Sequence, residues 1–347
     1  MSPFNPSQSS LMARETAESA AVVAGQLAAN REATRRFGRI IRGLDPRVVV
    51  TVARGSSDHA SLYLKYLIEI LTGIPCASLG PSIASLYQTK LRLDGALGVA
   101  ISQSGASPDI VALQTAVKQG GALTLALVND AESPLALAAD CLLPLHAGAE
   151  KSVAATKSVI AAMAAGAALI TDWRGDGALA AALERLPDAL DGAPAPPAQA
   201  IDLIAGARSM FVIGRGATYA IAAEAALKLK ETCAIHAEAF SSAEVLHGPA
   251  GVIVQGFPVI AFMPQDAARA GMVETLARLA AMGARLLVVD AADQEYIRPH
   301  PEERPKGASR RTRAATAVRA AHPSRPFAAQ RAPQDGGVGF FGQACRS

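Results

Sequence analysis

A cluster of hydroxyl groups follows one of the apolar runs of the chain, at residues 102–109. The stretch has the sequence SQSGASPD, so Ser102, Ser104 and Ser107 fall within six residues. Ser107 is suited to cap a helix that begins at Pro108, and such a helix directs unpaired N–H groups and the positive end of its dipole at a bound anion. The pattern is typical of a phosphate site, although capping alone also accounts for these serines.

A second turn of the same kind occurs at residues 54–57, which have the sequence RGSS and follow the β-branched run of residues 47–53. The carboxyl ends of neighbouring parallel strands meet at one edge of a sheet, so two hydroxyl-rich turns there indicate a phosphorylated small molecule. Neither turn is a G-x-G-x-x-G fingerprint or a P-loop, which disfavours a dinucleotide or a nucleoside triphosphate.

Two acidic residues and a lysine share one face of a predicted helix that begins near residue 217. Glu224, Lys228 and Glu231 are spaced i, i+4 and i+7. An ordinary ion pair explains the first two, whereas the functional interpretation makes Glu231 a base that moves a proton between substrate carbons. His247 precedes Gly-Pro on a predicted turn and can titrate near neutral pH, whereas His236 is interpreted as structural.

The elements that position these residues follow from the hydrophobic pattern. Residues 15–41 predict an amphipathic helix. Beyond it, short apolar runs that do not alternate in polarity are separated by helix-like segments, which indicates an α/β fold with a parallel sheet buried on both faces. These runs lie at residues 47–53, 74–79, 96–101, 122–128 and 141–145.

The chain contains an internal repeat. Residues 210–218 match residues 49–57 in pattern, and later apolar runs recur at nearly the same offset, which predicts two copies of one α/β unit. After residue 297 the last strand and long helix of the first copy do not recur, so we expect a C-terminally truncated second copy and a disordered tail, as from a shifted reading frame. The expected segments are a helical prefix at 1–46, a first domain at 47–186, a Pro/Ala-rich linker at 187–198, a second domain at 199–297 and a basic tail at 298–347.

Composition narrows the class of protein. Half of the residues are hydrophobic (50%) and 18% are charged, which excludes a disordered or fibrous protein. The net charge of +3 comes from residues 298–347, which lack interleaved aromatic residues, so we expect no nucleic-acid partner. The longest apolar run, residues 158–170, is shorter than the ~20 residues of a membrane span. With no signal-peptide pattern and four widely separated cysteines, we expect a cytoplasmic protein without a metal site.

Taken together, these segments resemble the sugar isomerase (SIS) domain family. Within it they are similar to the isomerase half of glutamine–fructose-6-phosphate aminotransferase and to SIS-type glucosamine-6-phosphate deaminases. The matching segments are residues 54–57, 102–105, 153–157, 214–216, 224–231, 236–238 and 244–249.

The resemblance implies two tandem SIS domains, each a parallel sheet flanked by helices in a three-layer, flavodoxin-like arrangement. It implies that Glu231 is the base for proton transfer between C1 and C2, and that His247 assists ring opening from the neighbouring subunit of a homodimer. It implies no metal or redox cofactor. The residues that it assigns to the sugar phosphate are Ser56, Ser57, Ser102, Gln103, Ser104, Ser107, Val153 and Lys228.

Three departures from the family pattern shape the expected reaction. Ser2 stands where a glutaminase domain would carry its cysteine, so we expect glucosamine 6-phosphate to be deaminated to fructose 6-phosphate and ammonia rather than made from glutamine. Ala155 replaces a frequent substrate-facing serine, and residues 298–347 lack the lysine-bearing segment that ends family members. An aminotransferase-like or plain phosphosugar isomerase, and a non-catalytic sugar-phosphate-binding protein, are the alternatives.

Overall fold

The structure of the chain is a computed structural model that describes residues 10–193, 196 and 198–291. The expectations placed on Ser2, on the basic tail at 298–347 and on the end of the second domain after residue 291 therefore lie outside the described residues. Within the described part of the chain, no helix is both long and apolar enough to span a membrane.

Two helices precede the first sheet, α1 (Leu11–Ala17) and α2 (Ser19–Leu44). The helix predicted over residues 15–41 is therefore confirmed, with a break at Glu18 between its two parts. α2 packs along α7, and the contact is close because Gly38 has no side chain there. A Cβ atom on Gly38 would lie 2.6 Å from the carbonyl carbon of Asp172.

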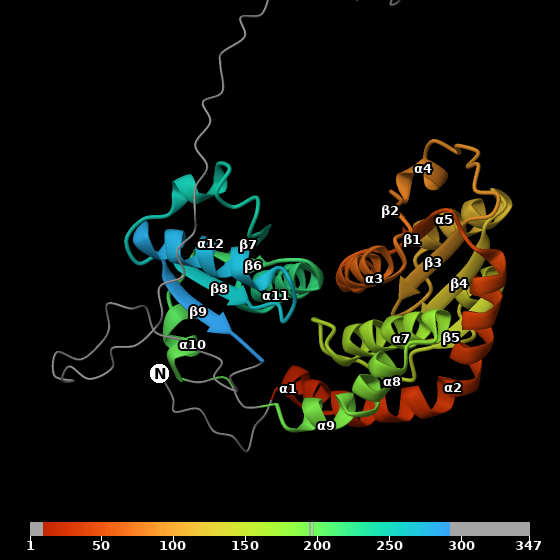
Figure 1. Ribbon diagram of the computed structural model, residues 1–347, viewed down its shortest axis with the longest axis horizontal. Helices are drawn as coiled ribbons and strands as arrows, with labels where there is room; N and C mark the ends of the chain where they lie inside the picture. The colour runs from red at the N-terminus through yellow and green to blue at the C-terminus, as the bar shows by residue number, and fades with distance from the viewer. Residues whose placement is uncertain (1–9, 194–195, 197, 292–347) are drawn as a thin grey trace, which may run out of the picture. The chain divides into compact units, whose positions relative to one another are not determined.

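The first sheet is parallel and has the strand order β2-β1-β3-β4-β5 (Figure 1). Alternate side chains of its strands enter two apolar clusters, one with Leu64 of α3 and Leu169 of α7, the other with Ile110 and Leu113 of α5. Helices thus cover both faces, as the apolar runs predict. The elements are β1 (Val49–Val52), α3 (Ser56–Thr72), β2 (Cys76–Ser78), α4 (Ser82–Ser85), β3 (Leu97–Ser102), α5 (Pro108–Gln119), β4 (Leu123–Val128), α6 (Pro134–Ala138), β5 (Cys141–Pro144) and α7 (Lys157–Arg174).

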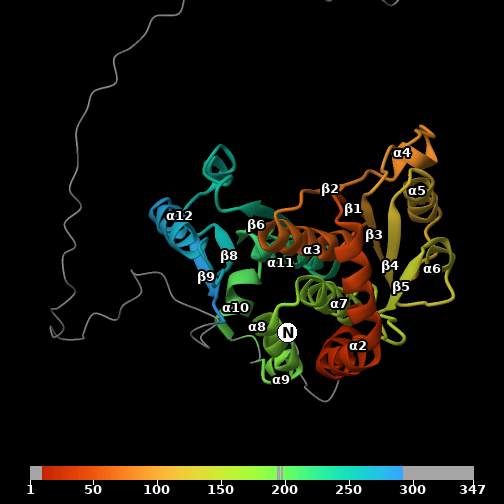
Figure 2. The same cartoon turned by 45° about the vertical axis from the view of Figure 1, so that its right-hand side comes forward.

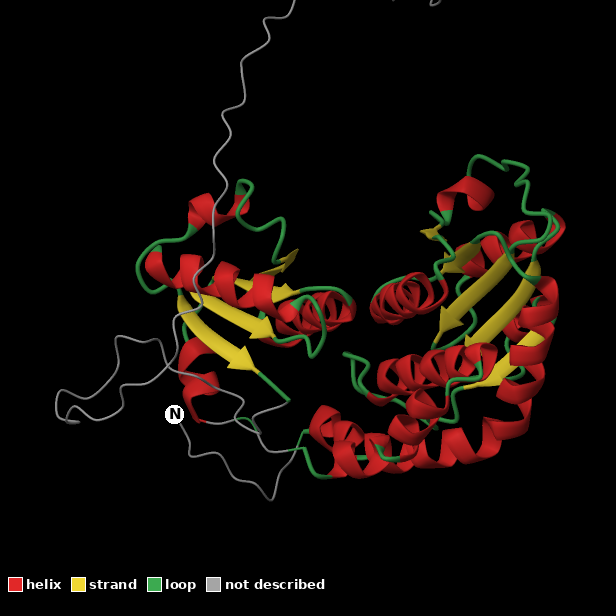
Figure 3. Ribbon diagram, viewed as in Figure 1, coloured by secondary structure: helices red, strands yellow, loops and turns green. Residues whose placement is uncertain are grey.

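The second sheet is also parallel and has the order β7-β6-β8-β9, with helices on both of its faces (Figure 3). Val212 of β6 packs with Ala222 of α11 on one face, while Phe211 packs with Met272 of α12 on the other. The elements are α10 (Ala198–Ile204), β6 (Ser209–Gly214), α11 (Ala217–Cys233), β7 (His236–Ser241), the 3-10 turn η2 (Pro249–Val252), β8 (Pro258–Phe262), α12 (Arg269–Ala281) and β9 (Arg285–Val289).

The backbone confirms the repeat that the sequence predicts. Gly55, the N-cap residue of α3, has φ 58° and ψ −135°, and Gly216, the N-cap residue of α11, has φ 59° and ψ −136°. Both torsion pairs lie in a region that glycine adopts without steric cost. The strand-to-helix turn is therefore built in the same way in both copies, and glycine is required at both positions.

The predicted linker at 187–198 is partly helical. α8 (Gly177–Glu184) is followed by α9 (Leu186–Asp191), which packs against α2. Pro187 does not prevent this because it lies in the first turn of α9, where the missing N–H group breaks no helical hydrogen bond. Residues 187–191, which the abundance of proline and alanine placed in the linker, therefore lie in α9.

Candidate active site

The two hydroxyl-rich turns lie at the same edge of the first sheet. β1 and β3 are parallel neighbours with Val52 opposite Ala100, so the turns that follow them begin side by side. The guanidinium group of Arg54 in the first turn forms an ion pair with the carboxylate of Asp109 after the second turn. The expected juxtaposition of the two turns is therefore observed directly.

The turn after β3 is closed by its own serines. The Ser102 hydroxyl accepts a hydrogen bond from the Gly105 N–H group at 3.0 Å, and the Ser104 hydroxyl accepts one from the Ala106 N–H group at 3.3 Å. Gly105 has a φ of 62°, and a Cβ atom on it would overlap the Ser133 side chain. The glycine is thus required both by its backbone torsion and by the space around it.

The N-terminus of α5 offers donors to a ligand. Ser107 is its N-cap residue and Pro108 is in its first turn, as predicted, but the Ser107 side chain makes no capping hydrogen bond. Its hydroxyl therefore remains available, unlike that of an ordinary cap. Asp109 in the first turn would repel an anion, and the ion pair with Arg54 offsets that charge.

Lys228 of α11 connects the proposed base to the first residue of α3. Its ammonium nitrogen lies 2.7 Å from Glu231 Oε2 and 3.3 Å from Glu224 Oε1, and it donates a hydrogen bond to Ser56 Oγ at 3.1 Å. The sequence suggested a solvated helix face, but only 16% of the Lys228 side chain is exposed. The reason is that α11 packs against α3 (Figure 2).

His59 completes this group and carried no signal in the sequence analysis. Its Nδ1 atom lies 2.7 Å from Glu224 Oε2. Burial alone would raise the pKa of the Glu224 carboxyl, but the hydrogen bond with His59, the charge of Lys228 and the hydrogen bond with Ser56 lower it. His59 follows Ser56 by three residues and so shares its helix face, which is the signal that could have identified it.

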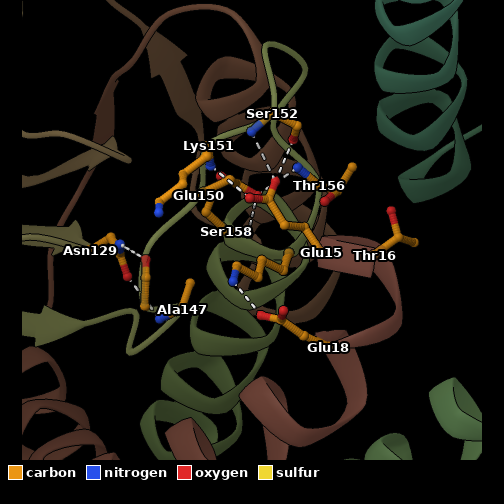
Figure 4. Close-up of polar contacts among 12 residues, drawn as sticks. Glu15, Thr16, Glu18, Asn129, Ala147, Glu150, Lys151, Ser152, Thr156 and Ser158 are labelled. Carbon is orange, nitrogen blue, oxygen red and sulfur yellow. Dashed lines mark hydrogen bonds and ion pairs between the residues drawn. The ribbon is translucent and has the colours of Figure 1, made fainter. Parts of the chain in front are cut away.

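The loop between β5 and α7 carries Val153, whose side chain is 98% exposed. Within this loop the Glu150 carboxylate accepts hydrogen bonds from the N–H groups of Thr156 at 2.8 Å and Ser158 at 3.3 Å (Figure 4). The N-terminus of α7 is therefore already occupied by a carboxylate. At α5 the Ser107 side chain forms no capping bond, and the Asp109 carboxylate accepts a hydrogen bond from the Ile110 N–H group at 3.0 Å while it is paired with Arg54. The positive charge of Arg54 at this end favours α5 as the anion-binding helix end.

Comparison with known proteins assigns the chain to a family. The SIS domain model matches residues 45–172 and 203–301, which include both sheets and both turns. The chain belongs to the SIS domain family. The α/β fold with two parallel sheets, predicted from the resemblance, is thereby confirmed for the described residues.

Several proteins similar to this SIS protein are named for sugar phosphates. The isomerizing glutamine–fructose-6-phosphate aminotransferase of Symbiobacterium thermophilum is 36% identical over 268 residues, which are 73% of this chain and 43% of the relative. The chain therefore spans less than half of that relative. A candidate phosphosugar isomerase from Silicibacter pomeroyi DSS-3 has a TM-score of 0.79 and 46% identity, covering 82% of this chain and 87% of that one.

Two more distant solved structures have a similar fold. The C-terminal domain of the Francisella tularensis glucosamine-fructose-6-phosphate aminotransferase has a TM-score of 0.68 and 25% identity, covering 82% of this chain and 84% of that chain. Glucosamine-6-phosphate deaminase from Thermotoga maritima has a TM-score of 0.59 and 18% identity, covering 78% and 85%. At that identity the deaminase shares the fold alone with this SIS protein.

The other residues that the sequence assigns to the site include Ser57, Gln103 and His247. Ser57 and Gln103 are half-buried; Gln103 lies in the turn after β3, as the sequence predicts, whereas Ser57 lies in the first turn of α3. His247 is exposed, and its backbone N–H group donates to the Glu244 carbonyl at 2.8 Å. Among the described residues, no hydrogen bond or ion pair joins the His247 side chain to Lys228 or Glu231. Within this SIS chain, His247 thus stands apart from the Lys228 group.

Proposed function

We propose that this SIS protein is a phosphosugar aldose–ketose isomerase that deaminates glucosamine 6-phosphate to fructose 6-phosphate and ammonia. One observation carries the proposal. The Lys228 ammonium group links the Glu231 carboxylate to the Ser56 hydroxyl, so that a candidate base lies beside a candidate phosphate turn. An aldose–ketose conversion needs this combination of a held phosphate and a nearby proton acceptor.

The phosphate is proposed to bind at the N-terminus of α5. Ser102, Ser104 and Ser107 supply hydroxyl groups there, Gln103 adds an amide, and the helix dipole favours a dianion. Ser56 and Ser57 of the neighbouring turn, Val153 and Lys228 are proposed to contact the rest of the ligand. The uncapped Ser107 hydroxyl supports this arrangement.

Glu231 is proposed to transfer the proton. In the opened sugar it removes the hydrogen on C2 as a proton and returns it to C1, while a proton lost by the C2 ammonium group passes through solvent to O1. The C1 aldehyde thereby becomes an alcohol and the C2 ammonium group becomes an iminium group. Water then attacks C2 and ammonia leaves, which gives the ketose. The conversion is redox-neutral overall, so it requires no external electron carrier. Lys228 at 2.7 Å orients the Glu231 carboxylate for this role.

Incubation of the full chain with glucosamine 6-phosphate, followed by measurement of ammonia and fructose 6-phosphate, tests the reaction. We expect Glu231→Gln to lower kcat by about a hundredfold to ten-thousandfold, because it removes a general base. Glu274→Gln on α12, which also neutralises an exposed glutamate of the second domain, is the matched control. Ligand binding without any product in the parent chain would instead identify a non-catalytic sugar-phosphate-binding protein.

His247 is proposed to act from the partner in a homodimer. Its exposure and its lack of a side-chain link to Lys228 within the described chain are consistent with action in trans. Mixing inactive Glu231→Gln and His247→Asn subunits then creates dimers with one intact site, and we expect roughly a quarter of the parent activity. A mixture that stays inactive although subunits exchange would contradict a shared site.

A further inference from the structure

A carboxylate from the N-terminal helix holds the loop that carries Val153. Glu15 of α1 is only 4% exposed. Its carboxylate accepts hydrogen bonds from the N–H groups of Lys151 at 2.7 Å and Ser152 at 3.1 Å, and from the Ser152 hydroxyl at 2.5 Å (Figure 4). Three donor groups of one loop thus bind a single carboxylate, which belongs to a helix that precedes the sheet.

A second carboxylate holds the other end of the same loop. Glu18, three residues after Glu15 at the break between α1 and α2, forms an ion pair with the Lys157 ammonium group at 2.5 Å. The Lys157 side chain is 4% exposed. Because residues three apart lie on one helix face, α1 and its C-terminus present both acidic groups to residues 151–157 together.

The loop depends on these contacts because it forms no strand or helix between β5 and α7. Backbone N–H groups that are not paired in a ladder must find other partners, and hydrogen bonds to a charged acceptor are about twice as strong as neutral ones. Glu150 satisfies Thr156 and Ser158 from inside the loop, while Glu15 satisfies Lys151 and Ser152 from outside it.

The contacts of Glu15 and Glu18 with residues 151–157, called the clamp below, come from a helix outside the matched SIS domain. The SIS match begins at residue 45, so α1 lies outside it. The hydrogen bond from Ser152, followed by that from Lys151, lowers the pKa of Glu15, which keeps its carboxylate charged at neutral pH. The clamp fixes the backbone of the loop, while the side chain of Val153 in that loop is exposed and free to contact a ligand.

We propose that Glu15 is a positioning residue for the sugar phosphate, which fixes the backbone at Lys151 and Ser152 and thereby holds the loop around Val153 ready for the ligand. This inference rests on the proposed function, because Val153 is assigned to the sugar-phosphate site there. Glu15 itself takes no part in proton transfer. Its loss should therefore weaken ligand binding and leave the chemical step intact.

Two measurements on the full-length Glu15→Gln variant test the inference. Glutamine cannot accept all three hydrogen bonds, so we expect amide hydrogen exchange in residues 149–156 to accelerate about tenfold. We also expect the KM for glucosamine 6-phosphate to rise about tenfold while kcat stays within about twofold, which is the signature of lost ground-state positioning. Glu32→Gln, which neutralises an exposed glutamate of α2, should change neither quantity.

Each outcome decides the inference. Unchanged exchange in Glu15→Gln would show that the clamp does not hold the loop, and faster exchange with an unchanged KM would show that loop order does not matter to the ligand. If Glu15→Gln does not fold, Glu15→Asp keeps the charge on a shorter side chain and should give the same changes at smaller amplitude. If the parent chain neither binds nor converts glucosamine 6-phosphate, the proposed function is wrong, and the exchange comparison still decides whether Glu15 orders the loop.

Discussion

His59 Nδ1 lies 2.7 Å from Glu224 Oε2, although the two residues are 165 positions apart in the chain. The contact joins α3 of the first domain to α11 of the second. Glu224 in turn lies 3.3 Å from Lys228, so the pair supports the residue that holds the proposed base. A histidine without a local motif thus becomes part of the candidate active site through packing alone.

Removal of His59 should destabilise the fold. In His59→Ala the Glu224 carboxylate stays largely buried with one hydrogen-bonding partner fewer, and we expect a loss of about 1–3 kcal/mol in the free energy of unfolding. Urea unfolding of the two proteins measures the difference. His236→Ala is the control: the sequence suggests a structural role for His236, but its side chain is exposed on β7, so this variant should stay within about 0.5 kcal/mol of the parent. Equal effects of the two substitutions would contradict a special role for His59.

The stability contributed by Glu224 should disappear in acid. Burial raises the pKa of its carboxyl, but His59, Lys228 and Ser56 together lower it below the ordinary value of 4.5. A carboxyl with a lowered pKa stabilises the fold above its ordinary pKa and loses that contribution as the pH falls through the lowered value. The stability gap between the parent and Glu224→Gln should therefore shrink between roughly pH 6 and pH 3 in urea unfolding. A gap that is constant over this range would show that Glu224 does not titrate in this way.

Ser107→Ala distinguishes a phosphate ligand from a helix cap. Since its hydroxyl makes no capping bond, we expect stability to change by less than about 0.5 kcal/mol, while the KM for glucosamine 6-phosphate rises about tenfold. Asp176→Ala, which removes the side-chain cap that accepts from the Leu179 N–H group of α8, should instead lower the stability and leave the KM unchanged. A stability loss of about 1 kcal/mol in Ser107→Ala with an unchanged KM would instead identify an ordinary cap.

Gly105→Ala should lower the free energy of unfolding more than Gly95→Ala does. Both glycines have positive φ values, 62° and 70°, so each alanine costs about 1 kcal/mol for its backbone torsion. Only the Cβ atom at Gly105 meets other atoms, those of Ser133 and Val128, which should add about 1–3 kcal/mol. Urea unfolding compares the two variants, and glucosamine 6-phosphate binding should weaken in Gly105→Ala alone. Equal destabilisation would mean that the turn has room to relax.

Much of the fold follows from local patterns. Unbroken apolar runs predict the parallel strands, and the match between residues 49–57 and 210–218 predicts the shared turn geometry of Gly55 and Gly216. The placement of Ser107 and Pro108 at the start of α5 also follows from capping preferences. The connector at 187–198 was less predictable, because proline is compatible with the first turn of α9.

The contacts within the candidate site depend on tertiary packing rather than on local sequence. Hydrophobic period, turn residues and capping depend on neighbours within a few positions, so the amino-acid sequence by itself determined the strands, the two serine turns and the repeat. The pairing of His59 with Glu224, and of Glu15 with the loop at Lys151, joins helices and loops far apart in the chain. Only the packing of α11 on α3 and of α1 on that loop brings these charges together, because side-chain contacts across elements depend on tertiary geometry that no local spacing encodes.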